Sequence, residues 1–185
     1  MVNREDRGLS SRTTILVTSF STWKYHQRDN SSDVLLAALQ ETHPDFVATH
    51  CRLLRRLPVD APRATRRILA AIGRWHPAYV VLCGMGGSPD LKIEGVAGLG
   101  GARQRSNLDV RALARDLPAT RPSRFAGRYV CNETYYRVLK AIRARRLKPG
   151  CVFVHVPLLG RKNTGPVTAD FFEILSRLNQ TRRLG

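Results

Sequence analysis

Residues 128–157 read RYVCNETYYRVLKAIRARRLKPGCVFVHVP, and they join the pattern of a helix to the pattern of a strand. Behind the cysteine, apolar residues recur at three- and four-residue steps, which predicts a helix over residues 131–145. The apolar run over residues 151–156 predicts a buried strand. Cys131 therefore opens the predicted helix, and His155 lies near the C-terminal end of the strand that follows it.

Cys131 and His155 are the residue types that a thiol hydrolase needs. The first backbone N–H groups of a helix and the positive end of its dipole stabilise an anion, and cysteine pKa values fall at such positions. We therefore expect a lowered pKa for Cys131, with His155 as the base that takes its proton. Whether the two side chains meet depends on the fold, because their separation along the chain does not fix it.

Strand and helix patterns alternate along most of the chain, which predicts an α/β fold. We expect a single-domain, three-layer α/β/α structure with a largely parallel, mixed central sheet. The site of such a sheet lies beyond the C-terminal ends of its strands, so the loops after Phe20 and Cys83 should open beside His155. Residues 98–127 have little periodicity and are predicted to form a long loop. The other strands are expected at 14–20, 46–53, 78–83 and 91–96, and the other helices at 33–41, between Asp60 and Pro77, and at 168–177.

The length of 185 residues and the hydrophobic content of 43% fit one globular domain. We assign residues 1–12 to a flexible N-terminus and residues 13–185 to the α/β domain. No apolar run approaches the roughly 20 residues of a membrane span. The N-terminus also lacks the apolar stretch of a secretory signal.

The four cysteines of the chain form no close pair of the kind that binds zinc. Three of them, Cys51, Cys83 and Cys151, are expected to be small buried side chains in apolar segments. This pattern favours a reducing, cytoplasmic setting without disulfides, and it argues against a metal site.

The net charge of +17 is the least expected property of the chain. Such a charge can mark a nucleic-acid partner, because basic side chains neutralise phosphates. The basic residues are spread in short groups, without interleaved aromatic residues or a nucleic-acid-binding motif. A solvated, arginine-rich surface is therefore favoured over a nucleic-acid partner, and both interpretations stay open.

Several segments resemble the motifs of one enzyme family, in the same order along nearly the whole chain. Residues 126–132, AGRYVCN, are similar to the motif Ala-Gly-x-Tyr-Val-Cys-Asn, and residues 154–157, VHVP, to the histidine motif. Residues 83–97, CGMGGSPDLKIEGVA, resemble Gly-Gln-x-Gly-Gly-Arg-x-x-Ile-x-x-Glu-Arg-x-Ala. Residues 18–20 and 30–32 resemble a degraded form of Gly-Phe-x-Pro-Phe-Gly…Asn-Pro-Ser. The chain is thereby identified as a divergent member of the pyroglutamyl peptidase (pyrrolidone-carboxylate peptidase) family of cysteine peptidases.

The resemblance implies a catalytic triad without metal or cofactor. Cys131 matches the nucleophile, His155 the general base and acid, and Glu94 the carboxylate that orients the imidazole. Backbone N–H groups around Cys131, and those of the Gly86-Gly87 loop, are candidates for stabilising the oxyanion.

The resemblance also implies a substrate pocket. Phe20, Trp23 and Val130 match positions that enclose the pyrrolidone ring, and Asn30 matches an asparagine that holds the neighbouring loop. The departures from the family fall in this region: Trp23 replaces a phenylalanine and Gly84 replaces a glutamine. Ser31, Ser88 and Gly95 also depart from the family motifs.

We therefore expect a cysteine-dependent exopeptidase or amidohydrolase. It would remove an N-terminal pyroglutamyl or related cyclic acyl group from a peptide or small amide through a thiol acyl-enzyme. The alternative is a catalytically inactive family member that acts as a basic nucleic-acid- or partner-binding protein. The family resemblance also implies a homo-oligomer, and no membrane partner is expected.

Overall fold

The computed structural model describes residues 14–23, 29–127 and 129–181. The expected flexible N-terminus, residues 1–12, lies outside the described residues. No helix in the described part of the chain is both long enough and apolar enough to cross a bilayer. The elements in chain order are β1 (Ile15–Phe20), α1 (Ser31–Thr42), α2 (Pro44–His50), β2 (Cys51–Leu57), α3 (Ala61–Trp75), β3 (Tyr79–Met85), β4 (Leu91–Glu94), β5 (Val96–Leu99), β6 (Ala102–Arg105), α4 (Val110–Ala114), β7 (Thr120–Ser123), α5 (Val130–Ala144), β8 (Gly150–Val156) and α6 (Thr164–Thr181).

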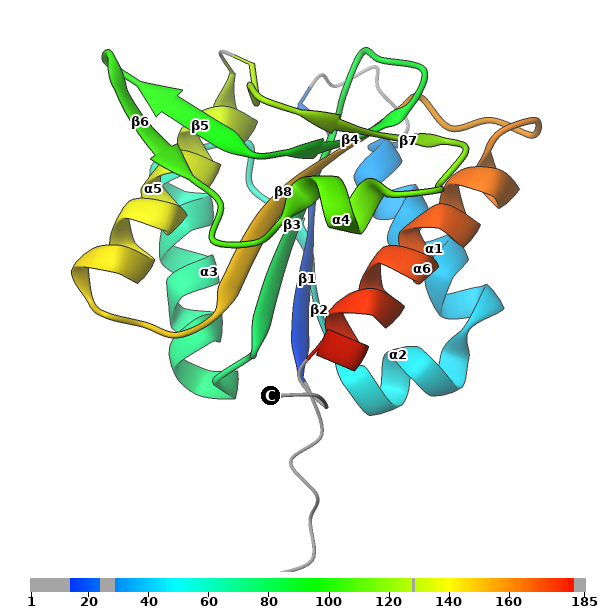
Figure 1. The fold of residues 1–185 in the computed structure, drawn as a ribbon, viewed down its shortest axis with the longest axis horizontal. Coiled ribbons are helices and arrows are strands. Elements are labelled where there is room, and N and C mark those ends of the chain that lie inside the picture. The colour runs from blue at the N-terminus through cyan, green and yellow to red at the C-terminus, as the bar shows by residue number, and fades with distance from the viewer. Residues whose placement is uncertain (1–13, 24–28, 128, 182–185) are drawn as a thin grey trace, which may run out of the picture.

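The core of the fold is a mixed sheet of six strands in the order β2-β1-β3-β8-β4-β7. Strands β2, β1, β3 and β8 run parallel, whereas β4 is antiparallel to β8 and parallel to β7. Helices α3 and α5 cover one face of this sheet, and α1, α2 and α6 cover the other (Figure 1). The three-layer α/β/α architecture with a largely parallel sheet is confirmed.

The central strands are apolar throughout because both faces of the sheet are covered. Side chains alternate between the faces of a strand. On β8, Val152 and Val154 pack toward the α1 and α6 layer, and Cys151 and Phe153 pack toward the α3 and α5 layer. His155 follows Phe153 by two residues, so it lies on the face that α5 covers.

The prediction of a strand over residues 46–53 is wrong in its first half. Residues Pro44–His50 form helix α2, and the strand begins only at Cys51. Pro44 occupies the first turn of the helix, where a missing N–H costs nothing and the fixed φ angle suits the helix. The apolar pair Phe46 and Val47 therefore packs from a helix and not from a strand.

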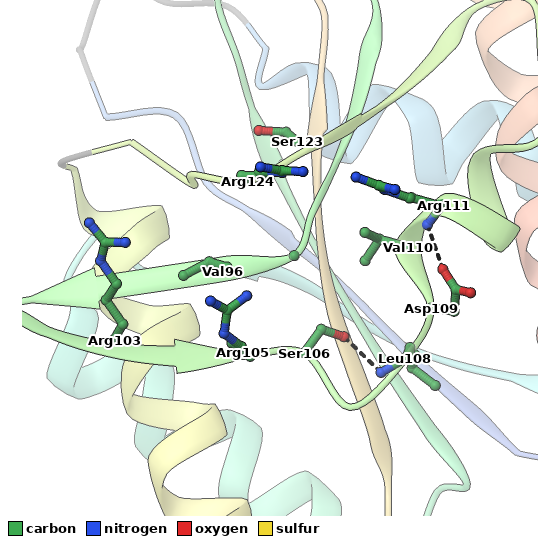
Figure 2. A pocket seen from close by; sticks show the side chains of 11 residues that line it. Val96, Arg103, Arg105, Ser106, Leu108, Asp109, Val110, Arg111, Ser123 and Arg124 are labelled. Carbon is green, nitrogen blue, oxygen red and sulfur yellow. Dashed lines mark hydrogen bonds between the residues drawn. The ribbon is translucent and has the colours of Figure 1, made fainter.

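The prediction of a long loop over residues 98–127 is also wrong. This segment contains most of the β5–β6 hairpin, helix α4 and the edge strand β7. Gly100 and Gly101 make the hairpin turn with positive φ angles of 55° and 81°, which glycine adopts without steric cost. The hairpin lies over α5, and together with the start of α4 it borders a pocket of about 560 Å³ (Figure 2).

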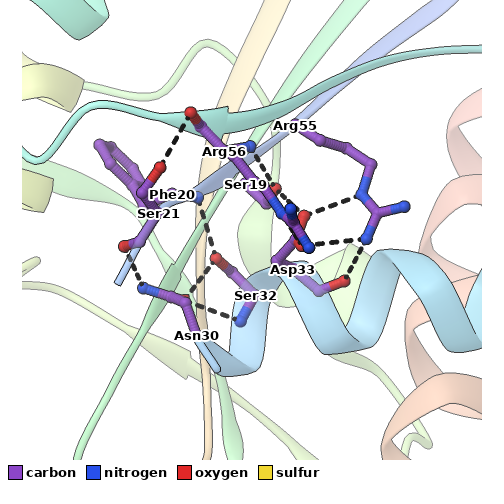
Figure 3. Close-up of polar contacts among 8 residues, drawn as sticks. All are labelled: Ser19, Phe20, Ser21, Asn30, Ser32, Asp33, Arg55 and Arg56. Atoms are coloured by element: carbon purple, nitrogen blue, oxygen red, sulfur yellow. Dashed lines mark hydrogen bonds and ion pairs between the residues drawn. The ribbon is translucent and has the colours of Figure 1, made fainter. Parts of the chain in front are cut away.

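An ionic network around the buried Asp33 joins the end of β1 to the start of α1 and the end of β2 (Figure 3). The carboxylate of Asp33 accepts a hydrogen bond from Ser19 Oγ at 2.7 Å. It also accepts hydrogen bonds from the Nε atoms of Arg55 at 2.8 Å and Arg56 at 2.9 Å. Burial alone would raise the pKa of Asp33, but these hydrogen bonds outweigh it and lower the pKa to about 2. The loop that follows Phe20 is thereby tied to the sheet edge.

We predict that Asp33→Asn lowers the free energy of unfolding at pH 7 by about 2 kcal/mol, since one pKa unit corresponds to about 1.4 kcal/mol. The folded-state pKa is lower than the unfolded one, so the stabilisation is present above about pH 4. It is lost as the pH falls through about 2. Urea unfolding followed by circular dichroism between pH 2 and 7 measures both effects. Glu41→Gln on the exposed face of the same helix is the matched control, and an equal loss in both variants would contradict the prediction.

Candidate active site

Cys131 lies in the first turn of α5, as the sequence predicted. The N-cap residue, Tyr129, makes no side-chain hydrogen bond to the helix, so no side chain caps the N–H groups of this turn. The first N–H groups of a helix have no partner within it and are available to an anion. Cys131 is half-buried, whereas Cys51, Cys83 and Cys151 are buried, as predicted for these three.

The expected lowering of the pKa of Cys131 is wrong. Burial raises the pKa of Cys131 to about 12 and outweighs the hydrogen bond from its own backbone, which acts in the opposite direction. Removal of the thiol from water disfavours the charged thiolate, and one helix terminus does not compensate. The free thiol is therefore neutral at pH 7, and its reaction as a nucleophile requires a base next to it.

His155 and Glu94 form a hydrogen-bonded pair on the face that α5 covers. The distance between His155 Nδ1 and Glu94 Oε1 is 2.9 Å, and the Glu94 side chain is buried. In the antiparallel pairing of β4 with β8, Glu94 lies opposite Phe153, so its side chain points to the same face as that ring and as His155. The hydroxyl of Tyr135 on α5 donates to the backbone carbonyl of Glu94 at 3.0 Å and fixes the end of β4.

This pairing decides how His155 can react. With Nδ1–H donating to the carboxylate, the imidazole keeps its lone pair on Nε2, which is the atom free to accept a proton. The second oxygen of Glu94, Oε2, is buried without a hydrogen-bond partner among the described residues. His155 is thus the main neutralising neighbour of a buried carboxylate, and an imidazolium formed there is stabilised by the ion pair.

Two glycines at the end of β3 allow the cysteine and the histidine to pack against the same strand. A Cβ atom on Gly84 would lie 2.7 Å from Cys131 Sγ and 2.8 Å from a ring carbon of Phe153. A Cβ atom on Gly86 would lie 2.9 Å from the Cβ atom of His155. The rings of Phe153 and His155 are in contact, with centroids 4.7 Å apart. The fold therefore gathers the three predicted catalytic residues around Phe153 and the end of β3.

The prediction that Gly86 supplies an oxyanion donor is wrong. Its N–H donates to the carbonyl of Val156 at 2.8 Å and is not available to a substrate. Gly87 is exposed, and a Cβ placed on it would meet no atom within 4 Å. The N–H groups of the first turn of α5 and that of Gly87 are the donors that stay candidates for the oxyanion.

The predicted pocket residues differ in their surroundings. Phe20 is buried in the same cluster against which Val130 and Cys131 pack. Trp23 is 62% exposed at the end of the described part of its loop. Asn30 is buried: its Oδ1 accepts from Ser32 N, which caps α1, and its Nδ2 donates to the carbonyl of Ser21. Asn30 thus holds the loop, and it makes no contact that singles it out as a substrate ligand.

Asn132 is a positioning residue to which the sequence analysis gave no role. Its buried side chain accepts from Gly98 N at 2.9 Å and donates to Gly98 O, so it fastens the β5–β6 hairpin to the start of α5. Asparagine has a low intrinsic preference for helices, and its place directly after Cys131 in a helix was the signal that it makes a tertiary contact. No group of three His, Cys, Asp or Glu side chains able to hold a metal occurs among the described residues.

Comparison with known proteins finds relatives of one kind. No family model matches the chain. A pyrrolidone-carboxylate peptidase of Pseudomonas fluorescens strain SBW25 is 33% identical over 140 residues, which cover 61% of this chain and 65% of that protein. A second pyrrolidone-carboxylate peptidase of Pseudomonas fluorescens is 28% identical over 138 residues, covering 60% of this chain and 64% of the relative. The chain is thus similar in sequence to two pyrrolidone-carboxylate peptidases. The matched part spans slightly less than two thirds of the length of each relative.

Solved structures of pyrrolidone-carboxylate peptidases have the same fold. Pyroglutamyl peptidase I of Bacillus amyloliquefaciens superposes with a TM-score of 0.76 at 15% identity, over 91% of this chain and 95% of that chain. The pyrrolidone carboxyl peptidase of Thermococcus litoralis superposes with a TM-score of 0.72 at 17% identity, over 91% of this chain and 94% of that one. The α/β architecture is therefore that of the pyrrolidone-carboxylate peptidases, although most side chains differ.

We predict that iodoacetamide alkylates Cys131 before the other three cysteines, because Cys131 is half-buried whereas the other three are fully buried. Since burial holds the pKa of Cys131 near 12, the rate should rise about tenfold per pH unit from pH 7 to 10. Mass spectrometry of tryptic peptides measures the site and the rate, with Cys131→Ala as the control. A rate that is flat below pH 8 would contradict this prediction, because it would show that the thiolate already exists.

We predict that Gly84→Ala displaces the Cys131 thiol, because the buried ring of Phe153 on the other side cannot yield. Overpacking of this kind costs about 1–3 kcal/mol of stability, and the rate of alkylation at Cys131 should change by at least about threefold. Urea unfolding and alkylation kinetics measure the two effects. Gly73→Ala on α3, where an added Cβ meets nothing within 4 Å, is the control and should be neutral or stabilising. Identical behaviour of the two variants would rule out the close approach at Gly84.

Proposed function

We propose that this protein is a cysteine peptidase that removes an N-terminal pyroglutamyl or related cyclic acyl group. The observation that carries the proposal is the hydrogen bond of 2.9 Å between His155 Nδ1 and Glu94 Oε1, on the sheet face where Cys131 opens α5. A buried carboxylate that orients an imidazole is the third member of a nucleophile–base–acid set. The curated relatives are named pyrrolidone-carboxylate peptidases, which supports the same reaction class.

The first half of the reaction forms an acyl-enzyme. Nε2 of His155 takes the proton of the Cys131 thiol, and the sulfur forms a bond to the carbonyl carbon of the cyclic residue. The carbonyl electron pair moves to the oxygen, where the N–H groups of the first turn of α5 stabilise the negative charge. His155 then gives its proton to the amine as the carbon–nitrogen bond breaks, and the shortened peptide leaves.

The second half of the reaction restores the thiol. Nε2 of His155 takes a proton from water while the water oxygen attacks the thioester carbon. When the carbon–sulfur bond breaks, the imidazolium returns a proton to the sulfur of Cys131. Glu94 stabilises the imidazolium in both halves through its buried carboxylate, and it does not itself need to change protonation.

The surroundings of the thiol support an altered acyl preference. Gly84 replaces the family glutamine, so a polar side chain is missing next to Cys131 and the thiol itself lies against this position. Large apolar side chains are exposed in the segments that follow β1 and β8 and precede α5, where the site opens. A substrate with an apolar ring or an apolar second residue would bury part of this surface. The exposed residues are Trp23, Phe125, Tyr129 and Leu158.

Hydrolysis of a pyroglutamyl-aminocoumarin under reducing conditions tests the proposal. We expect release of the fluorophore by the unmodified protein and a loss of at least about 10³-fold in Cys131→Ala, since removal of a nucleophile abolishes the covalent route. Cys51→Ala removes a buried thiol at the start of β2 and should leave the rate unchanged. A rate that survives in Cys131→Ala would overturn the assignment of the nucleophile.

Glu94→Gln tests the role of the carboxylate separately. The amide keeps the size of the side chain but removes the charge that favours the imidazolium, so kcat should fall by about 10²–10⁴-fold with little change in KM. If the pyroglutamyl substrate is not turned over, a panel of other cyclic N-acyl aminocoumarins distinguishes an altered acyl group from an inactive protein. No turnover of any member of the panel would contradict the proposed function.

A further inference from the structure

The pocket between the β5–β6 hairpin and α4 is lined by four arginines. In Figure 2, Arg105, Arg111 and Arg124 extend into the same space, and Arg103 lies further out along β6. These arginines come from β6, the first turn of α4 and the segment after β7. The tertiary fold therefore brings them together, and a local sequence motif does not. Neither Cys131, His155 nor Glu94 lines this pocket.

The four guanidinium groups make no hydrogen bond or ion pair with any other residue that the structure describes. Arg105 and Arg111 take part in hydrogen bonds only through their backbones. The single acidic residue of the pocket, Asp109, is engaged elsewhere: its carboxylate accepts from the N–H groups of Arg111 at 2.9 Å and Ala112 at 3.1 Å. Like charges that face one concavity repel each other, and a bound anion removes this repulsion.

The side chains that line the pocket define the chemistry of the ligand that it can bind. A single carboxylate would neutralise only one of the four guanidinium groups, whereas a phosphate group accepts paired hydrogen bonds from arginine and carries up to two charges. The volume of about 560 Å³ falls within the range of small-molecule sites. None of the described residues that line the pocket is aromatic, so the pocket offers no aromatic ring on which a nucleobase could stack. The hydroxyl of Ser123 can donate to a phosphate oxygen, whereas that of Ser106 already donates to the carbonyl of Cys151 at 2.9 Å.

We propose that this pocket binds a compact anion with two or more linked phosphate groups, recognised through the phosphates alone. A second cavity of about 710 Å³ adjoins this pocket at Leu108, but it does not continue the arginine cluster. Its lining is mainly apolar, and only Arg146 and Lys148 carry a permanent charge there. A short oligophosphate therefore matches the concentration of charge better than a nucleic-acid strand does. This site is independent of the proposed peptidase activity.

Isothermal titration of the full chain with sodium tripolyphosphate at 50 and 200 mM NaCl tests the proposal. Each arginine that binds a phosphate should contribute about tenfold in affinity, so Arg105→Gln with Arg124→Gln should weaken binding by about 100-fold. Arg66→Gln with Arg67→Gln removes the same charge from the exposed face of α3, outside the pocket, and should change affinity by less than about threefold. Circular dichroism confirms that both double variants are folded.

Two further ligands identify the source of the phosphates. Equal affinity for ATP and tripolyphosphate would show that the phosphates alone are recognised, as expected. Equal weakening in both double variants would overturn the site, because it would show that only the net charge matters. A single-stranded RNA of 20 nucleotides that binds without competition from tripolyphosphate would also overturn it, in favour of a nucleic-acid surface.

Discussion

The antiparallel pairing of β4 with β8 is the constraint on which the candidate active site depends. In a parallel sheet, a strand beside β8 would present its C-terminal end at the same edge. Here β4 runs in the opposite direction, so that Glu94 lies opposite Phe153 in the middle of β8. Its side chain then reaches back along the shared face to Nδ1 of His155. One reversed strand thus buries a carboxylate next to the imidazole, and its hydrogen bond engages Nδ1 and not Nε2.

The same close packing that assembles the site also determines the state of its thiol. Gly84 lets Cys131 approach the sheet so closely that the sulfur loses water, and burial raises the pKa of Cys131 to about 12. In the proposed reaction, the N–H groups of the first turn of α5 stabilise the negative charge that appears on the substrate oxygen only after attack.

The parts of the fold that follow from local pattern could be predicted, and the parts held by distant contacts could not. The runs that form β1, β3 and β8 and the periodicity of α5 depend on burial alone, and they occur where expected. The region 98–127 has short elements whose partners are far along the chain: Asn132 binds Gly98, and Asp170 binds Thr120. The triad residue types could likewise be read from motifs. Two features of the site could be known only from the strand pairing. They are the close approach of Cys131 to Gly84 and the hydrogen bond from the Gly86 N–H to the carbonyl of Val156.

The excess of positive charge also has a structural distribution that the sequence did not reveal. Some arginines stabilise the fold: Arg55 and Arg56 neutralise Asp33, and Arg177 donates to three carbonyls around the end of α4. The arginines that line the pocket beside α4 have no such partner among the described residues. Their convergence is imposed by a hairpin that Asn132 fastens to α5. Asn132, which follows the proposed nucleophile, therefore also holds in place the hairpin that carries Arg103 and Arg105 of the proposed anion pocket.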